Sequence, residues 1–165
     1  MRPPPFLSGV SMERFLFSDI LDTRAVIPSL EAVTKDGVLR EAARVLASIG
    51  GDTPERLHSL FATREGQAST AFREGIAIPH IKWEGPFMAG LAISRKGIDF
   101  CALDGKPVHL FFILAAPRAL AGEHLKMMAR ISRLTVHDEW LAALLKENHD
   151  TAAIMGIIKS LEGGL

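Results

Sequence analysis

The sequence predicts an α/β domain with three layers, in which helices cover both faces of one central β-sheet. Apolar residues recur at helical spacing early in the chain, extended segments follow, and helical spacing returns at the end. The segment 108–116 is apolar at nearly every position, as is typical of a central strand covered on both faces. The 165 residues suffice for one domain, which we place at 13–165.

The first half of the chain carries clear signals for where helices begin and end. Thr34 and Thr53 are candidate N-caps, and Pro54 follows at the first helical position. Gly50 and Gly51 end the first of these helices. The predicted elements are, in order, a flexible proline-rich tail over 1–12, an apolar segment around 15–21, a strand over 25–27, a helix between Thr34 and Gly50, and a helix over roughly 54–64.

In the second half, extended segments precede three helices. Pro79 ends the second of two short extended segments, and residues 99–107 have the composition of a turn between two longer strands. Gly122 opens the first helix. The predicted elements are extended segments at 68–71 and 75–80, strands over 87–94 and 108–116, and helices over 123–134, 138–146 and 151–161.

The charge balance and the single cysteine exclude several classes of function. Nineteen Lys and Arg side chains balance nineteen Asp and Glu, and a net charge of zero argues against binding nucleic acid or an anionic membrane. Cys101 cannot form an internal disulfide, which favours a reduced, cytoplasmic location. No spacing of ligating residues is typical of a metal site, so no metal or cofactor is predicted. The longest apolar run, 108–117, is too short for membrane insertion.

Two of the six histidines are candidates for chemistry near neutral pH. His80 follows Pro79 at the end of an extended segment, where its ring would project into the mouth of the sheet. His124 lies in the first turn of a helix, whose positive end favours an anion and lowers the pKa of the imidazole. Spacing alone leaves a structural role open for both. Solvated, capping or backbone-paired positions are expected for His58, His109, His137 and His149.

Three motifs, taken in order, resemble those of a known family. They are Arg64-Glu65 with Ser69-Thr70 and Gly75-Ile76-Ala77-Ile78-Pro79-His80, then the segment 97–110, and then Gly122-Glu123-His124-Leu125. The family is that of the enzyme IIA domains of the fructose–mannitol type in the phosphoenolpyruvate-dependent sugar phosphotransferase system. The resemblance covers nearly the whole chain and implies a mixed central sheet. A short chain without a fused transporter or second phosphocarrier domain is most similar to the nitrogen-regulatory branch.

The resemblance implies a role for each matched side chain. His80 takes the place of the histidine that accepts a phosphoryl group from an HPr-like phosphocarrier protein. His124 matches a second histidine that stabilises the phosphoryl oxygens, and Arg64 matches an arginine suited to pair with the dianion. Ser69 and Thr70 match a Ser-Thr pair and are candidate phosphate-binding residues. Hydroxyls that merely satisfy the backbone are the alternative for this pair.

The resemblance implies a phosphotransferase component that carries a phosphohistidine and regulates other proteins by its phosphorylation state. One alternative is a sugar-specific component that passes the phosphoryl group to a IIB domain during fructose or mannitol uptake. Another is a non-catalytic, protein-binding relative. Two departures from the family pattern leave carrier specificity open: Ala71-Phe72-Arg73-Glu74-Gly75 replaces a glycine-rich link, and Ile81 replaces a glycine, which should make the rim of the site bulkier.

Overall fold

The computed structural model describes residues 15–146 and 148–164, so the predicted tail over 1–12 lies outside the described residues. The helices are α1 (Phe17–Ile20), α2 (Lys35–Gly50), α3 (Pro54–Gln67), the 3₁₀ turn η3 (Arg118–Leu120), α4 (Ala121–Leu134), α5 (Asp138–Lys146) and α6 (Thr151–Gly163). The strands are β1 (Leu21–Ile27), β2 (Ala71–Arg73), β3 (Ile76–Ala77), β4 (His80–Trp83), β5 (Met88–Ile98) and β6 (Val108–Pro117). Every predicted helix is present, with ends shifted by a few residues.

The central sheet is mixed, as the resemblance implied. Its strand order is β1-β5-β6-β3-β2, and β4 also pairs with β6. The strand β6 is antiparallel to β5 but parallel to both β3 and β4. Outside this centre, β1 is parallel to β5 and β2 is antiparallel to β3. Two short strands therefore follow one another along the same side of β6.

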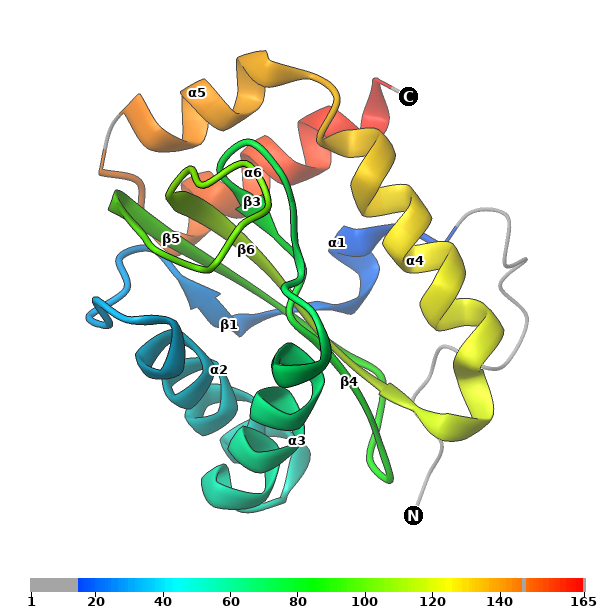
Figure 1. The fold of residues 1–165 in the computed structure, drawn as a ribbon. Helices are drawn as coiled ribbons and strands as arrows, with labels where there is room; N and C mark the ends of the chain where they lie inside the picture. Colours follow the sequence, from blue (N-terminus) through cyan, green and yellow to red (C-terminus); the bar gives the residue numbers. More distant parts are fainter. Residues whose placement is uncertain (1–14, 147, 165) are drawn as a thin grey trace.

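Helices cover both faces of the sheet, which confirms the predicted three layers (Figure 1). Side chains of β6 alternate between two cores. Phe112 and Leu114 pack with α1, α4, α5 and α6, whereas Phe111 and Ile113 pack with α2 and α3. All four are buried. Because full burial of one such side chain contributes about 1.5–3 kcal/mol, this strand anchors both helix layers.

The helix termini confirm the predicted caps. The Thr34 hydroxyl accepts a hydrogen bond from the Gly37 amide at 3.1 Å, which satisfies one of the free donors in the first turn of α2. Thr53 caps α3 in the same way. Gly51 follows α2 with φ of 75°, a left-handed conformation that glycine adopts without strain.

Two buried carboxylates fix segments that the hydrophobic pattern does not specify. Glu162 near the end of α6 accepts hydrogen bonds from the amides of Phe17 and Ser18, at 2.5 and 3.1 Å, and so caps α1 from a distant part of the chain. Glu41 of α2 accepts the amides of Glu31 and Ala32 at 3.3 and 3.1 Å. Each carboxylate satisfies backbone donors that burial would otherwise leave without a partner.

The placement of His80 differs from the prediction. His80 does not end an extended segment but opens β4, a strand that was not predicted, and it pairs with Leu114 of β6. Pro79 has no amide hydrogen and interrupts the pairing after β3, while its carbonyl accepts a hydrogen bond from the Leu114 amide at 3.0 Å. The chain therefore stays beside β6 across the proline and resumes regular pairing at His80.

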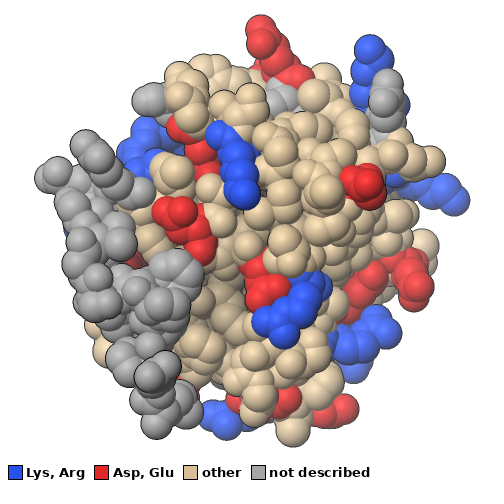
Figure 2. All heavy atoms as spheres, turned by 180° about the vertical axis from the view of Figure 1, so that it is seen from behind, with Lys and Arg blue, Asp and Glu red and all other residues tan. Residues whose placement is uncertain are grey.

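Charges are distributed without a dominant sign. On the face opposite to the view of Figure 1, acidic and basic side chains are interspersed among uncharged ones (Figure 2). This arrangement agrees with the net charge of zero. Within the described part of the chain, no helix combines the length and the apolar character needed to cross a bilayer.

Candidate functional site

The two candidate histidines lie side by side although they come from different elements. His80 is the first residue of β4, and His124 lies in α4 on the same side of the sheet. Their ring centroids are 5.3 Å apart and the ring planes are inclined by 75°. The structure thus brings together the pair that the sequence predicted.

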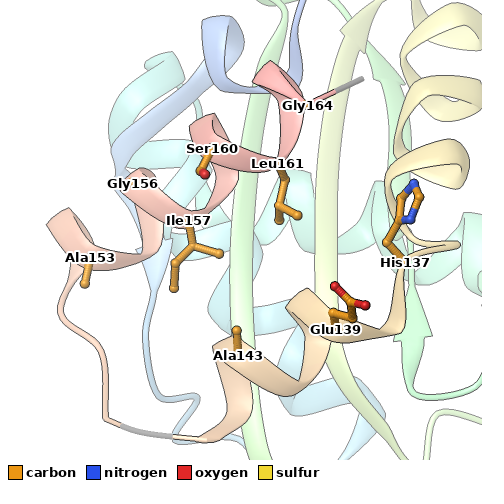
Figure 3. A pocket seen from close by; sticks show the side chains of 9 residues that line it. All are labelled: His137, Glu139, Ala143, Ala153, Gly156, Ile157, Ser160, Leu161 and Gly164. Atoms are coloured by element: carbon orange, nitrogen blue, oxygen red, sulfur yellow. The ribbon is translucent and has the colours of Figure 1, made fainter.

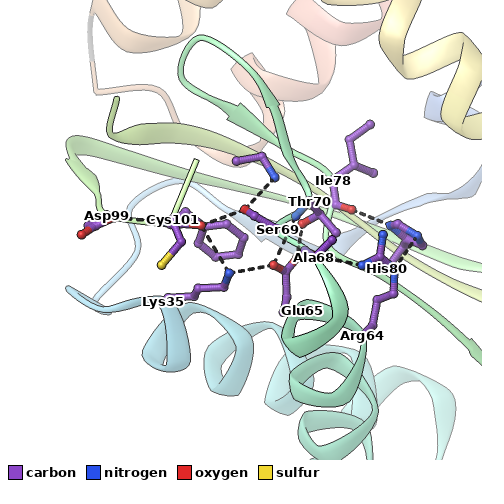
Figure 4. Close-up of polar contacts among 12 residues, drawn as sticks. Lys35, Arg64, Glu65, Ala68, Ser69, Thr70, Ile78, His80, Asp99 and Cys101 are labelled. Atoms are coloured by element: carbon purple, nitrogen blue, oxygen red, sulfur yellow. Dashed lines mark hydrogen bonds and ion pairs between the residues drawn. The ribbon is translucent and has the colours of Figure 1, made fainter. Parts of the chain in front are cut away.

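The hydrogen bonds of His80 define which ring nitrogen is free to react. Its Nδ1 lies 2.7 Å from the Ile78 carbonyl oxygen, which can only accept, so Nδ1 carries the hydrogen. Nε2 then holds a lone pair and accepts a hydrogen bond from Nε of Arg64 at 3.2 Å (Figure 4). Burial lowers the pKa of His80, the Ile78 carbonyl opposes this effect, and the Arg64 charge lowers the pKa further. The result is a neutral imidazole with a half-buried nucleophilic nitrogen.

His124 is more deeply placed. Its side chain is buried, and its Nε2 has no hydrogen-bond partner among the described residues. Burial lowers the pKa of His124 to about 4, with smaller contributions from the charges of His80 and Lys82. The lowering therefore has the predicted direction, and burial is its largest cause. A buried nitrogen without a partner costs free energy, and such an atom is informative because native structures contain few of them.

The low pKa of His124 predicts a specific sensitivity to acid. In the unfolded chain this ring takes up a proton near pH 6.5, whereas the folded protein resists protonation until about pH 4. The unfolded chain therefore binds more protons than the folded protein between pH 6.5 and pH 4. The free energy of unfolding falls as the pH drops through this range. For this group alone we expect a loss of about 2 kcal/mol between pH 7 and pH 5, measured by urea denaturation. His80 acts in the same direction.

The matched comparison is His124→Gln, which has no titrating group at this position. It should lose the contribution of His124 to the pH dependence and keep that of His80, whereas His137→Gln, at an exposed position, should retain the full dependence. An equal slope in the wild type and in His124→Gln would contradict the assignment.

Arg64 completes a positively charged cleft beside His80. It lies in the last turn of α3, and its Nη1 donates a hydrogen bond to the Ala68 carbonyl at 2.9 Å, which holds the guanidinium toward His80. The cleft has a volume of about 400 Å³, and Lys82 and Arg118 also line it. No carboxylate is among its lining residues. Arg118 forms an ion pair with Glu84 at 2.9 Å, whereas Arg64 and Lys82 are cations beside a neutral imidazole and suit a multiply charged anion such as a phosphoryl group.

Ser69 and Thr70 lie next to this site, but their hydroxyls are engaged elsewhere. The Ser69 hydroxyl donates to the Phe100 carbonyl at 2.9 Å and accepts from the Ala71 amide at 3.2 Å. The Thr70 hydroxyl donates to the Glu65 carboxylate, which also accepts the Thr70 amide. Both residues therefore fix the segment between α3 and β2 (Figure 4).

The link over 71–75, which departs from the family pattern, does not form the rim of the site as expected. The Gly75 carbonyl accepts a hydrogen bond from the Leu110 amide at 3.0 Å, whereas His80 pairs with Leu114 further along β6. Four residues of extended chain separate these positions by about 13 Å. Because β3 runs parallel to β6, the chain leads away from this turn toward His80.

Two charged residues of the site, Lys82 and Arg118, were not predicted. Lys82 shares a face of β4 with His80, because side chains two positions apart on a strand point the same way, and it was missed because β4 itself was not predicted. Arg118 had no signal in the sequence, since only the fold brings it near the cleft. Ile81, the second departure from the family pattern, is 3% exposed and packs into the core beneath the cleft.

A larger cavity, of about 610 Å³, lies between α5 and α6 (Figure 3). Apolar side chains such as Ile157 and Leu161 line much of it, with His137 and Glu139 at one edge. No Lys or Arg is among its lining residues, so this cavity does not share the preference of the His80 cleft for an anion. Across the described residues, no three His, Cys, Asp or Glu side chains gather in a group able to hold a metal ion.

Three of the other four histidines are engaged locally, and the fourth, His137, is exposed. His109 Nδ1 lies 2.9 Å from the Ser94 carbonyl, as expected for a backbone-paired histidine. His58 contacts Asp36 at 2.7 Å, and His149 lies 2.8 Å from the Ala143 carbonyl. These contacts leave His80 and His124 as the pair with unusual surroundings.

Comparisons with known proteins agree with this geometry. The family model described as "Phosphoenolpyruvate-dependent sugar phosphotransferase system, EIIA 2" matches residues 19–161, which include all five predicted site residues. A nitrogen regulatory protein of Bradyrhizobium diazoefficiens is 34% identical over 144 residues, covering 86% of this chain and 93% of that protein. A PTS system fructose-specific EIIA component of Haloferax volcanii is 35% identical over 138 residues, covering 78% and 89%. The crystal structure of nitrogen regulatory protein IIA-Ntr from Neisseria meningitidis superposes with a TM-score of 0.79 at 25% identity, covering 86% and 97%.

Proposed function

Because the chain belongs to the EIIA type-2 family of the phosphoenolpyruvate-dependent sugar phosphotransferase system, we propose that it carries a phosphoryl group on Nε2 of His80. The donor is an HPr-like phosphocarrier protein. The observation that carries this assignment is the neutral His80 ring, whose free lone pair on Nε2 faces Arg64 at a cleft lined by cations. The single, unpaired cysteine favours a cytoplasmic site for the reaction.

The proposed reaction exchanges one phosphorus–nitrogen bond for another. Nε2 of His80 attacks the phosphorus of the donor phosphohistidine in line with the departing ring. The electron pair of the breaking bond returns to the nitrogen of the donor. The hydrogen stays on Nδ1 of His80 and keeps its hydrogen bond to the Ile78 carbonyl, so no proton transfer is needed. Catalysis then depends on positioning and on stabilising the charge of the transferring group.

Positively charged and polar groups around His80 are proposed to hold the phosphoryl oxygens. Arg64 offers a planar set of donors, and a neutral His124 with its hydrogen on Nε2 offers a buried one. The roles of Ser69 and Thr70 as direct phosphate ligands rest on the family resemblance. In the unphosphorylated protein their hydroxyls hold Phe100 and Glu65 instead.

Replacing Arg64 by lysine is expected to slow phosphoryl uptake by about tenfold, because lysine keeps the charge but loses the planar donors that contact His80 and Ala68. The rate is measured in a single turnover with a phosphorylated carrier. Arg56→Lys, at an exposed position of the same helix, is the matched control and should transfer at the wild-type rate. Equal rates for Arg64→Lys and the wild type would remove Arg64 from the proposed set.

The experiment that tests the function is phosphoryl transfer itself. The protein is incubated with phosphoenolpyruvate, enzyme I and either a sugar-type or a nitrogen-type carrier, and its intact mass is measured. We expect an acid-labile gain of about 80 Da, the mass of one phosphoryl group. No gain with either carrier would favour the non-catalytic, protein-binding alternative.

The downstream role divides into two candidates. We favour regulation of target proteins according to phosphorylation state, because a nitrogen regulatory protein covers more of this chain than the fructose-specific relative does. Transfer to a IIB domain during sugar uptake remains the second candidate, since the fructose-specific relative is equally similar in sequence. The phosphorylated protein is therefore offered to fructose-type and mannitol-type IIB domains. Rapid loss of the phosphoryl group to a IIB domain would favour the transport role.

A further inference from the structure

We propose that Lys35, Glu65 and Thr70 form a relay of hydrogen bonds that positions the backbone behind His80 and so keeps the reactive nitrogen free. None of the three contacts the imidazole, so each is a positioning residue. The proposal deepens the proposed function and rests on it. It accounts for a buried polar network that the phosphoryl-transfer mechanism does not otherwise use (Figure 4).

The relay begins with an ion pair between the two helices of one layer. Nζ of Lys35, at the start of α2, lies 3.0 Å from the carboxylate of Glu65 in the last turn of α3. The Glu65 side chain is only 3% exposed, so this carboxylate depends on its partners for compensation. Lys35 also donates to the Phe100 carbonyl at 3.3 Å and lies 4.7 Å from the centre of the Phe100 ring.

The second step connects the carboxylate to the backbone. Glu65 accepts hydrogen bonds from both the amide and the hydroxyl of Thr70, which is itself buried. The Thr70 carbonyl in turn accepts the Ile78 amide at 3.1 Å. One carboxylate on α3 thereby fixes the position of the peptide group between Ala77 and Ile78, and with it the Cα atom that carries the Ile78 carbonyl.

The third step reaches the ring. The Ile78 carbonyl accepts the hydrogen on Nδ1 of His80, and this bond determines which nitrogen carries the lone pair. A shift of Ile78 that moved its carbonyl would lengthen the bond to His80 and allow the hydrogen to move to Nε2, where it would block attack on phosphorus. The relay therefore acts on the tautomer of His80 as well as on its orientation.

The test compares two buried carboxylates that both hold backbone amides. Glu65→Gln removes the charge that Lys35 compensates, and Glu41→Gln removes the corresponding charge from a carboxylate that holds Glu31 and Ala32 instead. Nitrogen-15 NMR of the His80 ring reports the tautomer in the unphosphorylated protein. Single-turnover transfer from a phosphorylated carrier reports the rate, and urea denaturation reports stability.

We expect Glu65→Gln to bring the two ring-nitrogen shifts of His80 closer together, as the tautomers mix, and to slow transfer by about tenfold. Glu41→Gln should lose stability while it keeps the His80 spectrum and a rate within about twofold of the wild type. Unchanged His80 shifts and an unchanged rate in Glu65→Gln would overturn the relay. If the wild type takes up no phosphoryl group, the proposed function fails while the spectrum still decides whether the relay exists.

A second pair of variants covers the case in which Glu65→Gln does not fold. Thr70→Val removes only the hydroxyl link to Glu65 and preserves the backbone bonds and the volume. Thr70→Ser restores that hydroxyl. A disturbed His80 spectrum in Thr70→Val that Thr70→Ser restores supports the relay, and a wild-type spectrum in both overturns it.

Discussion

Replacing His80 by alanine is expected to abolish phosphoryl uptake, which is the largest effect of any single substitution in this protein. The variant loses the nitrogen that forms the new bond to phosphorus, and no neighbouring group can substitute for it. His124 lies beside His80, but its side chain is only 4% exposed and cannot meet the phosphohistidine of a carrier in line. Intact mass after incubation with phosphoenolpyruvate, enzyme I and carrier should therefore stay at the unmodified value.

The matched control is His58→Gln, which removes a histidine of α3 that contacts Asp36 of α2 and does not line the His80 cleft. It should gain one phosphoryl group like the wild type. A His80→Ala protein that still gains this mass would show that another residue is the acceptor and would overturn the assignment. Unfolding curves of both variants guard against loss of structure, since His80 is half-buried at the edge of the cleft.

The fold could be predicted from the sequence where local patterns decide it. Thr34 and Thr53 cap helices as expected, because an N-cap depends on residues within one turn. The apolar run of β6 predicted a central strand, because burial on both faces leaves no place for polar side chains. The strand β4 was missed, since its pairing with β6 depends on a strand distant in sequence.

The site was predictable only in part, for the same physical reason. His80, His124 and Arg64 stood in motifs that resemble a family, and the structure brings them together. Lys35 and Glu65 had no such signal for their pairing, because 30 positions of chain separate them and only the packing of α2 on α3 joins them. Burial of a charge is a property of the fold, and a sequence pattern does not encode its partner.

The balance of nineteen basic against nineteen acidic residues bears on how the proposed phosphorylation would be detected. Although the chain as a whole is neutral, positively charged side chains are in excess among the residues that line the cleft beside His80. A phosphoryl group adds about −1.5 to −2 charges at neutral pH. On a neutral chain the proposed phosphoryl group would change the net charge substantially and offset most of the positive charge of the cleft. If the proposed function holds, partner proteins would distinguish the two states by electrostatics at this one face.

Replacing His124 by leucine is expected to slow phosphoryl transfer and, in the same variant, to stabilise the protein. Loss of one buried donor to the transferring group costs about 2–3 kcal/mol, or roughly 30- to 150-fold in rate. Leucine has nearly the same volume and leaves no polar atom without a partner, so stability at pH 7 should rise by about 1–2 kcal/mol. Single-turnover transfer and urea denaturation measure the two effects.

Opposite effects on rate and stability are what identify a residue retained for function, because a structural residue lowers both when it is removed. The matched control is Met127→Leu, a buried position of the same helix where a similar apolar volume is exchanged. It should change neither quantity by much. Transfer at the wild-type rate in His124→Leu would show that its partnerless nitrogen does not serve the phosphoryl group. A slow and stabilised variant would instead mean that the free protein tolerates an unsatisfied nitrogen because the phosphoryl oxygens satisfy it during transfer.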